Sequence, residues 1–440
     1  MSSTESASPA SGVSLDRSRS ASPRPVIVHI PRRFTKTEWG GTETVIFHLA
    51  AELNKIGYDS VIYTSDLLAK AGDADVNGVR VKRFRGFYPR WGLSRAAKTQ
   101  LDYRGGNYFS LSLFFSLLFT PRLCAIHLHT GGFMGAMGRL VARLRRLPYV
   151  ISIHGGSLAL PPEQMRQLLA PLAGSFNWGK ALELIFPIKN VYRDAAAILC
   201  LSEEERRLNA EKYPRSKVLS SPNGVDSERF AAADGAAFRA KYGFAAETQM
   251  LLCVGSFHEQ KNQLALLEAF RLLQGEKLPN LRLVLIGVCY DESYLQMLQE
   301  RTHAYGLEQS VVFIRDLPYD SPDLANAFAA ADLFVLPSIY EPFGIVVLEA
   351  WSAHTPVVSG KLGGMADYGR DGENLCFADV QSPEDIAQKV AAVLTNPALA
   401  ARLADGGKET AREYSWAAIV RRMLPLYGKG DAEAAQSAEG

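Results

Sequence analysis

The stretch DLFVLPSIYEPFGIVVLEA, residues 332–350, decides the fold of this chain. Its apolar run 333–336 predicts a buried strand, the Pro and Gly of the segment 341–344 predict a tight turn, and the apolar residues after them predict a helix. Two carboxylates stand eight residues apart, Glu341 in the turn and Glu349 inside the helix. A helix that follows a strand in this way points free backbone N–H groups at an anion. The stretch therefore predicts a phosphate site, and a nucleotide is the simplest ligand.

The length and composition indicate a globular protein with two domains. The chain has 440 residues, more than one hydrophobic core usually supports. Its 48 Lys and Arg residues nearly balance 46 Asp and Glu residues, and the net charge of +2 does not favour nucleic acid as a partner. Five cysteines are scattered, mostly inside apolar runs, which predicts free thiols in a reducing compartment.

Apolar runs alternate with helical stretches along the chain, the pattern of parallel sheets with crossover helices. The predicted strands cover residues 26–30, 60–63, 125–129, 149–153, 196–201, 250–255, 281–287, 311–314, 333–336 and 356–359. The fold class is therefore α/β, with two doubly wound, Rossmann-like domains. In such sheets a ligand binds beyond the carboxyl ends of the strands, so we expect the substrate in a cleft where the two domains face each other.

The turn-rich segment 221–226 separates the predicted domains. We expect an N-terminal domain over residues 25–225 and a C-terminal domain over residues 226–412. A closing helix over residues 413–428, with Ser415 as its N-cap, is expected to pack back on the N-terminal domain. We predict that residues 1–24, which are rich in Ser, Ala and Pro, and residues 429–440 form disordered tails.

The chain has no obvious membrane segment. No apolar run reaches the roughly 20 residues that a spanning helix needs, and the N-terminus lacks an apolar signal core, so we predict a cytoplasmic protein. The apolar segment 108–119 favours a buried helix over insertion into a membrane surface. The nearby arginines Arg139, Arg143, Arg145 and Arg146 form either a solvated helix face or a peripheral contact with the anionic inner face of the plasma membrane.

Three further segments follow predicted strands and carry candidate site residues. Gly40 and Gly41 would let the backbone approach a ligand, although an ordinary loop would also contain them. His154 stands at the carboxyl end of a strand and is a candidate by its position. Lys261 precedes a predicted helix, where an ammonium and a helix N-terminus would act together on a diphosphate; the alternative is a solvated surface lysine.

Two other histidines and one acid in an apolar helix could each have either a ligand-binding role or a structural role. His127 and His129 have a spacing that suggests metal ligands, but no neighbouring carboxylate or cysteine completes a set, so we predict satisfied polar side chains and no metal. Glu349 lies in an apolar helix, where a carboxylate without partners would cost several kcal/mol. We expect it to bond a ligand such as a sugar diol; the alternative is a structural carboxylate on the helix dipole.

These residues together resemble the retaining glycosyltransferases of family 4, which have the GT-B architecture. The turn 341–344 with Glu349 carries the resemblance, which extends from about residue 26 to residue 426. The supporting matches are Gly40-Gly41, His154-Gly155, the segment 222–226, Lys261, Gly363-Gly364 and the segment 414–416.

The resemblance implies a role for each candidate. The catalytic set would be His154 near the transferred sugar, Lys261 on the diphosphate and Glu341 on the hydroxyls of the donor sugar. The donor-binding set would be Gly40, Gly41, Asn223, Lys261, Arg315, Gly344, Ile345, Val346 and Glu349. Within that set, Glu349 would bind the ribose, the amides of residues 344–346 would hold the diphosphate, and the base would lie against the backbone of residues 315–317.

One position departs from the family pattern. Many members have an arginine directly after the glycine of the loop at Gly255, where this chain has Ser256. Part of the charge neutralisation would then pass to other groups, such as His258. Asp367, after Gly363-Gly364, fits an acidic position of the family.

The implied function is a hexosyltransferase that moves a sugar from a UDP- or GDP-sugar to an acceptor hydroxyl with retention, and that holds no permanent cofactor. The acceptor would be a glycan or lipid-linked glycan of bacterial cell-surface polysaccharide, lipopolysaccharide or glycolipid synthesis, bound by the N-terminal domain near the basic, aromatic segment 80–119. The alternatives are a nucleotide-sugar epimerase of similar fold and a non-catalytic subunit that binds a nucleotide sugar. An epimerase would convert the nucleotide sugar without an acceptor.

Overall fold

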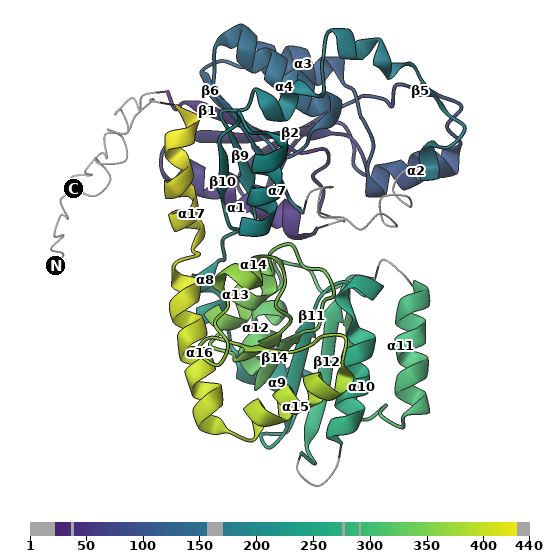
Figure 1. Ribbon diagram of the computed structural model, residues 1–440, viewed down its shortest axis with the longest axis vertical. Helices are drawn as coiled ribbons and strands as arrows, with labels where there is room; N and C mark the ends of the chain where they lie inside the picture. Colours follow the sequence, from purple (N-terminus) through teal and green to yellow (C-terminus); the bar gives the residue numbers. More distant parts are fainter. Residues whose placement is uncertain (1–22, 37–38, 156–169, 275–277, 290–291, 429–440) are drawn as a thin grey trace, which may run out of the picture.

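The computed structural model describes residues 23–36, 39–155, 170–274, 278–289 and 292–428. Two sheets lie one above the other along the long axis of the molecule, each between layers of helices (Figure 1). The predicted tails fall outside the described residues, except for residues 23 and 24. The α/β class with two doubly wound sheets is confirmed.

The N-terminal sheet has eight strands in the order β10-β9-β7-β6-β1-β2-β4-β3. All neighbouring strands are parallel except the edge pair β3–β4. The central strands are buried on both faces, which explains their uninterrupted apolar sequences. The bounds are β1 Val26–Ile30, β2 Asp59–Ser65, β3 Gly72–Val76, β4 Val79–Phe84, β6 Leu123–Leu128, β7 Tyr149–Ser152, β9 Ala197–Cys200 and β10 Val218–Ser220.

The C-terminal sheet has six parallel strands in the order β13-β12-β11-β14-β15-β16. Their bounds are β11 Gln249–Val254, β12 Leu281–Gly287, β13 Val311–Arg315, β14 Leu333–Leu336, β15 Val357–Ser359 and β16 Cys376–Phe377. Strands thus occur at all ten predicted positions. A separate two-stranded ribbon, β5 Arg90–Trp91 with β8 Phe176–Asn177, lies beside the N-terminal sheet.

Helices cover both faces of each sheet. In the N-terminal half they are α1 Gly41–Lys55, α2 Arg95–Arg104, α3 Leu111–Leu118, α4 Gly132–Arg145, α6 Asn190–Arg193 and α7 Glu203–Lys212. In the C-terminal half they are α8 Ser227–Ala231, α9 Gly235–Tyr242, α10 Gln263–Leu273, α11 Glu292–Ala304, α12 Pro322–Ala330, α13 Ile345–Ser352, α14 Gly363–Tyr368, α15 Pro383–Leu394 and α16 Pro397–Arg412.

The last helix, α17 Trp416–Met423, returns from the C-terminal to the N-terminal half (Figure 1). The Ser415 side chain caps it by accepting a hydrogen bond from the backbone N–H of Ala418 at 3.3 Å. The buried face of α17 packs in one cluster with Val45 and Leu49 of α1. The short turn η5 Leu424–Tyr427 then lies against β6 and β7.

Two details of the N-terminal half differ from the sequence predictions. α3 is not a fully buried helix: Leu113 and Leu117 face the core, whereas Phe115 and Phe119 are 51% and 76% exposed. Arg139 does not belong to an exposed basic face, because its guanidinium is buried in an ion pair with Asp194. No helix in the described ranges is both long enough and apolar enough to cross a membrane.

Candidate functional site

Two adjoining cavities lie between the halves of the chain. The larger has a volume of about 640 Å³ and the smaller about 400 Å³. Both are lined by Gly40 and Gly41 from the N-terminal half and by Ser256, Ile345 and Val346 from the C-terminal half. These volumes are in the range of small-ligand sites. A ligand that fills both cavities contacts both halves.

The N-terminus of α13 opens on both cavities. Gly344 precedes the helix with φ +84°, a left-handed conformation, and an added Cβ would lie 3.0 Å from the Tyr368 hydroxyl oxygen. That hydroxyl donates to the carbonyl oxygen of Phe343 at 2.8 Å and so fixes the turn. The first amides of a helix have no acceptor inside it, which leaves the N–H groups of Ile345 and Val346 for a ligand.

Lys261 and Glu341, predicted separately, form one ion pair in the smaller cavity. Lys261 Nζ lies 2.5 Å from Glu341 Oε2, and the two side chains are 21% and 11% exposed. The turn η4 Glu259–Lys261, after β11, carries the lysine, and the loop after β14 carries the glutamate. The pair therefore joins two neighbouring strand ends and presents both charges to the cleft.

Glu349 has a different environment. It lines the larger cavity, is 3% exposed, and its carboxyl group makes no hydrogen bond within the described part of the chain. Burial raises its pKa from 4.5 to about 7, partly opposed by Arg229 and reinforced by Asp226. It is the fifth residue of α13, beyond the first turn, so a structural carboxylate at the helix end does not explain it.

The opposite wall comes from the start of α1. Glu43 accepts a hydrogen bond from the Gly40 N–H at 3.2 Å, and this capping box fixes the helix start. A Cβ built on Gly41 meets no atom within 4 Å. Space is therefore open in front of the Gly41 backbone, as a close approach to a ligand requires.

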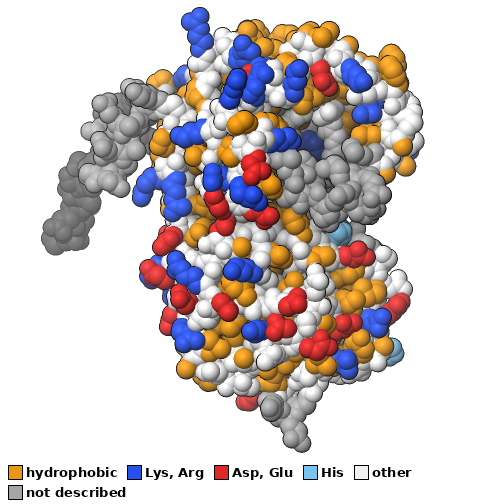
Figure 2. Space-filling model, in the orientation of Figure 1, with side chains coloured by type: hydrophobic (Ala, Val, Ile, Leu, Met, Phe, Trp, Pro, Cys, Tyr) orange, Lys and Arg blue, Asp and Glu red, His pale blue; other side chains and the backbone are white. Residues whose placement is uncertain are grey.

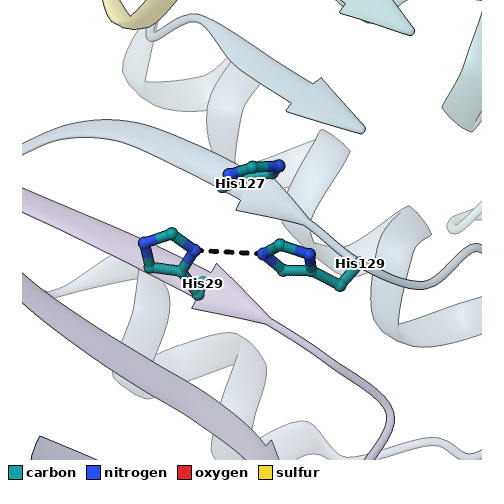
Figure 3. A group of neighbouring side chains, drawn as sticks. All are labelled: His29, His127 and His129. Atoms are coloured by element: carbon teal, nitrogen blue, oxygen red, sulfur yellow. Dashed lines mark hydrogen bonds between the residues drawn. The ribbon is translucent and has the colours of Figure 1, made fainter. Parts of the chain in front are cut away.

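His154 lines the smaller cavity together with Lys261 and Glu341. Behind it lies a group of buried imidazoles from adjacent strands, with His29 beside His127 in register and His129 two residues further (Figure 3). His29 Nδ1 is hydrogen-bonded to His129 Nε2 at 3.0 Å, and His129 Nδ1 to His154 Nε2 at 2.9 Å. His154 thus ends a line of three linked rings.

His29, His127 and His129 also stand close enough to share a metal ion, with one nitrogen of each within 4.8 Å of the others. His29, the third member, was not predicted from the sequence. His127 already bonds the Ser152 hydroxyl at 2.8 Å and the Tyr427 hydroxyl at 2.9 Å. Both ring nitrogens of His127 and His129, and Nδ1 of His29, are already used in hydrogen bonds, which a shared ion would have to displace. The contacts favour a hydrogen-bonded network.

Of the other predicted residues, some line the two cavities and others do not. Asn223 is buried and lines the smaller cavity. Asp316 and Leu317 line the larger cavity, but the Arg315 side chain is not among its lining residues and instead pairs with Glu292 at 2.6 Å. Asp367 lines neither cavity and accepts a hydrogen bond from the Glu203 N–H at 2.8 Å.

His258 does not take the place of the missing arginine at Ser256. Its ring nitrogen accepts from the Gln260 N–H at 3.3 Å, and it lines neither cavity. The expected compensation by His258 is therefore not observed.

Among the lining residues that were not predicted from the sequence, Trp39, His48, Arg229 and Tyr319 contact one another. Trp39 stacks on Tyr319 across the cleft with 5.8 Å between ring centroids, and His48 Nε2 is hydrogen-bonded to the Tyr319 hydroxyl at 3.2 Å. Arg229 lies over the Tyr319 ring at 5.0 Å. These residues are far apart in sequence, so no motif identifies them. The only signal in the sequence was that each side chain is aromatic or basic.

Known proteins resemble both halves of the chain. The family model for glycosyl transferases group 1 matches residues 234–410, and that for the glycosyl transferase 4-like domain matches residues 40–224. Mannosylfructose-phosphate synthase of Agrobacterium fabrum is 27% identical over 414 residues, covering 88% of this chain and 86% of that protein.

Two further similarities differ in extent. A D-inositol 3-phosphate glycosyltransferase of a Nocardioides strain is 32% identical over 243 residues, and the match spans about half of each chain, 52%. The crystal structure of HepE from Anabaena in complex with UDP and glucose has a TM-score of 0.67 at 17% identity, covering 91% of this chain and 99% of that one. At this identity the structural likeness concerns the fold.

Proposed function

The chain belongs to the group 1 glycosyl transferases and has their GT-B fold, and we propose that it moves a sugar from a nucleoside-diphosphate sugar to an acceptor hydroxyl with retention of configuration. The observation that carries the proposal is the placement of Glu349. Its carboxyl group, which has no hydrogen-bond partner in the described part of the chain, shares a cavity with Ile345 and Val346, whose amides are the first of α13. A ribose diol bound to a diphosphate offers hydroxyl donors and negative charge at these two places.

The donor would span the two cavities. The ribose would meet Glu349, the diphosphate would lie between the α13 amides and Gly41, and the sugar would lie near Glu341 and His154. The base would lie against the backbone of Asp316 and Leu317. HepE was crystallised with UDP and with UDP-glucose, which supports a uridine nucleotide as the first candidate.

The reaction replaces one bond at the anomeric carbon by another. The bond to the diphosphate oxygen breaks, the bond to the acceptor oxygen forms on the same face, and a phosphate oxygen takes the acceptor proton. Lys261 and the α13 N-terminus would stabilise the charge that grows on the leaving diphosphate. Glu341 orients the ammonium of Lys261 through their ion pair and accepts from sugar hydroxyls.

Two assays test the donor and the reaction. A thermal-shift screen with UDP-, GDP- and ADP-sugars should identify one that raises the melting temperature, because a ligand of the native state stabilises it by mass action. With that donor, Glu341→Ala should abolish transfer to glycan acceptors, and NMR of the product should show the donor's anomeric configuration. Near-normal turnover of Glu341→Ala, or an inverted product, would contradict the proposal. Conversion of the donor without an acceptor would identify an epimerase instead.

The surface of α3 and α4 supports a lipid-linked acceptor at an anionic membrane. Leu111, Phe115 and Phe119 follow at intervals of four residues, so they share one exposed face of α3. Leu144 at the end of α4, which packs on α3, is also exposed, between the exposed Arg143 and the partly buried Arg145. Figure 2 shows Lys and Arg side chains among hydrophobic ones over this upper end of the molecule. Apolar side chains flanked by arginines suit acyl chains beneath anionic headgroups.

Vesicle sedimentation tests the membrane contact. The protein should bind vesicles of phosphatidylglycerol and phosphatidylcholine in equal parts, and less so at high salt. The double substitution Phe115→Ser with Phe119→Ser should weaken binding, whereas Leu272→Ser, at an exposed apolar position on α10, should not. Absence of binding by the unaltered protein at low salt would contradict this part of the proposal.

A further inference from the structure

The line His29–His129–His154 runs from inside the N-terminal sheet to the cleft. His29 is fully buried on β1, His129 is 8% exposed just after β6, and His154 follows β7 at the wall of the smaller cavity. The two ring-to-ring hydrogen bonds use Nδ1 of His29, both nitrogens of His129 and Nε2 of His154. The line therefore ends at the only His154 nitrogen not used, Nδ1, which makes no hydrogen bond inside the described ranges.

All three rings are neutral at physiological pH. Burial lowers the pKa of His29 to about 3, that of His154 to about 4, and that of His129 well below its ordinary value. A neutral imidazole has one N–H donor and one acceptor nitrogen. Two successive bonds between three such rings therefore allow only two arrangements, with all protons on Nδ1 or all on Nε2.

The free end at His29 distinguishes the two arrangements. His29 Nε2 is buried and has no hydrogen-bond partner among the residues that the structure describes. With the protons on Nε2, this nitrogen would be a buried N–H donor without an acceptor, a rare arrangement in proteins. With the protons on Nδ1, it is only an unused lone pair, and both ring-to-ring bonds are kept. The arrangement with all protons on Nδ1 is therefore favoured, and it leaves His154 with its proton on Nδ1.

We propose that His29 and His129 are positioning residues that hold His154 in the Nδ1–H tautomer, so that His154 donates a hydrogen bond to the transferred sugar. The nature of the ligand in this statement rests on the proposed function, whereas the tautomer rests on the histidine geometry alone. His154 would then act as a neutral donor and not as a base, which agrees with a phosphate oxygen as the proton acceptor. The tautomer of a histidine is set by the bond that its other nitrogen makes.

The first test needs neither a substrate nor a variant. Long-range ¹H–¹⁵N NMR spectra of protein labelled with ¹⁵N-histidine distinguish the protonated nitrogen of each neutral ring. We expect Nδ1–H for His29, His129 and His154. A His154 ring with its proton on Nε2 would overturn the proposal, whatever the donor is.

Three substitutions test whether the line His29–His129–His154 sets the tautomer of His154. His29→Met replaces the donor by a thioether sulfur, a weak acceptor, at similar volume. The Nε2–H of His129 then has an acceptor, so part of the His154 population should convert to the Nε2–H form, with kcat/KM about tenfold lower, as expected for one lost hydrogen bond. His29→Asn returns an N–H near the Nδ1 position and should restore the tautomer. Tyr427→Phe is the matched control: it removes a buried hydroxyl from the neighbouring His127 and leaves the line intact.

The outcomes separate this inference from the proposed function. A His154 tautomer that does not change in folded His29→Met would overturn the role of the line, even if sugar transfer is confirmed. A shifted tautomer in His29→Met, restored in His29→Asn and unchanged in Tyr427→Phe, would support it even if the ligand proves to be another sugar compound. NMR spectra of the other histidines report whether each variant is folded.

Discussion

The two walls of the cleft are built from opposite kinds of group. The C-terminal wall carries charges, with the Lys261–Glu341 ion pair, the carboxyl of Glu349 and the N-terminus of α13. The N-terminal wall offers the open backbone at Gly41 and the neutral ring of His154. The two walls therefore offer different interactions to one ligand. In the proposed pose the C-terminal wall would supply the charged contacts to the diphosphate, the ribose and the sugar, whereas the N-terminal wall would supply a close backbone approach at Gly41 and a neutral hydrogen bond from His154.

Removal of the lysine should have the largest effect on the charged wall. Lys261→Met should lower the transfer rate about a hundredfold to a thousandfold, as for other groups that stabilise charge in the transition state. Lys361→Met is the control, because this exposed lysine lies over the Phe377 ring outside both cavities. Equal transfer rates for the two variants would show that Lys261 does not stabilise the transition state.

Substitutions at Gly41 test whether a ligand approaches the neutral wall, because they add side-chain volume without adding charge. Gly41→Ala and Gly41→Val should fold normally because an added Cβ meets no atom within 4 Å. The valine should weaken donor binding by at least about tenfold, or about 1.4 kcal/mol, and alanine by less. Calorimetric titration of the donor measures both, and undiminished affinity in Gly41→Val would show that no ligand approaches this backbone.

Glu349→Gln should have opposite effects on stability and on binding. The pKa of Glu349 is raised by burial from 4.5 to about 7, so the native state binds more protons than the unfolded state between these values. The contribution of Glu349 to stability is therefore lost as the pH rises from 4.5 to 7. At pH 8 without ligand, Glu349→Gln should be more stable than the unaltered protein by about 3 kcal/mol, with no difference at pH 4.

Urea unfolding at several pH values measures this difference. The glutamine variant should nevertheless bind the donor more weakly, because it has lost a charged acceptor for the ribose. A stability difference that does not depend on pH would contradict the buried, ionisable state of Glu349.

The smallest effect is expected at Arg315. Its side chain pairs with Glu292 and is not among the residues that line the two cavities. Arg315→Ala should therefore leave the donor affinity unchanged within a factor of about two, because only the backbone of this segment would face the base. A larger loss of donor affinity in a binding titration would show that the Arg315 guanidinium contacts the donor.

The predictability of the fold differs between strands for a physical reason. Most of the ten predicted strands are buried on both faces and therefore have continuous apolar sequences, whereas β13 is a partly exposed edge strand that is still apolar from Val311 to Ile314. β3 and β4 at the sheet edge have polar sequences, GDADV and VRVKRF; β3 was not predicted, and most of β4 lies in the segment interpreted as basic and aromatic. The alternation of Val79 and Val81 with Arg80 and Lys82 was a usable signal for β4. β16 has only two residues and gives no pattern.

The site shows the same contrast. Glu341, Gly344 and Glu349 lie in one short segment, so their turn and helix could be read directly from the sequence. The histidine line joins three strands and spans residues 29 to 154, and the ion pair of Lys261 joins residues 80 positions apart. Such contacts depend on strand order and register, which a single sequence does not specify.

The most direct test compares the two glutamates of the charged wall. The best nucleotide sugar and its nucleoside diphosphate are each titrated calorimetrically into the unaltered protein, Glu341→Gln and Glu349→Gln. Glu349→Gln should weaken both ligands by the same factor, about tenfold for one charged hydrogen bond, because both contain the ribose. Glu341→Gln should weaken the nucleotide sugar more than the nucleoside diphosphate, because a change in the Lys261 ion pair acts on both ligands whereas the lost sugar contact acts on one. If Glu341→Gln weakened the nucleoside diphosphate as much as the nucleotide sugar, the assignment of sugar and ribose to separate carboxylates would be wrong.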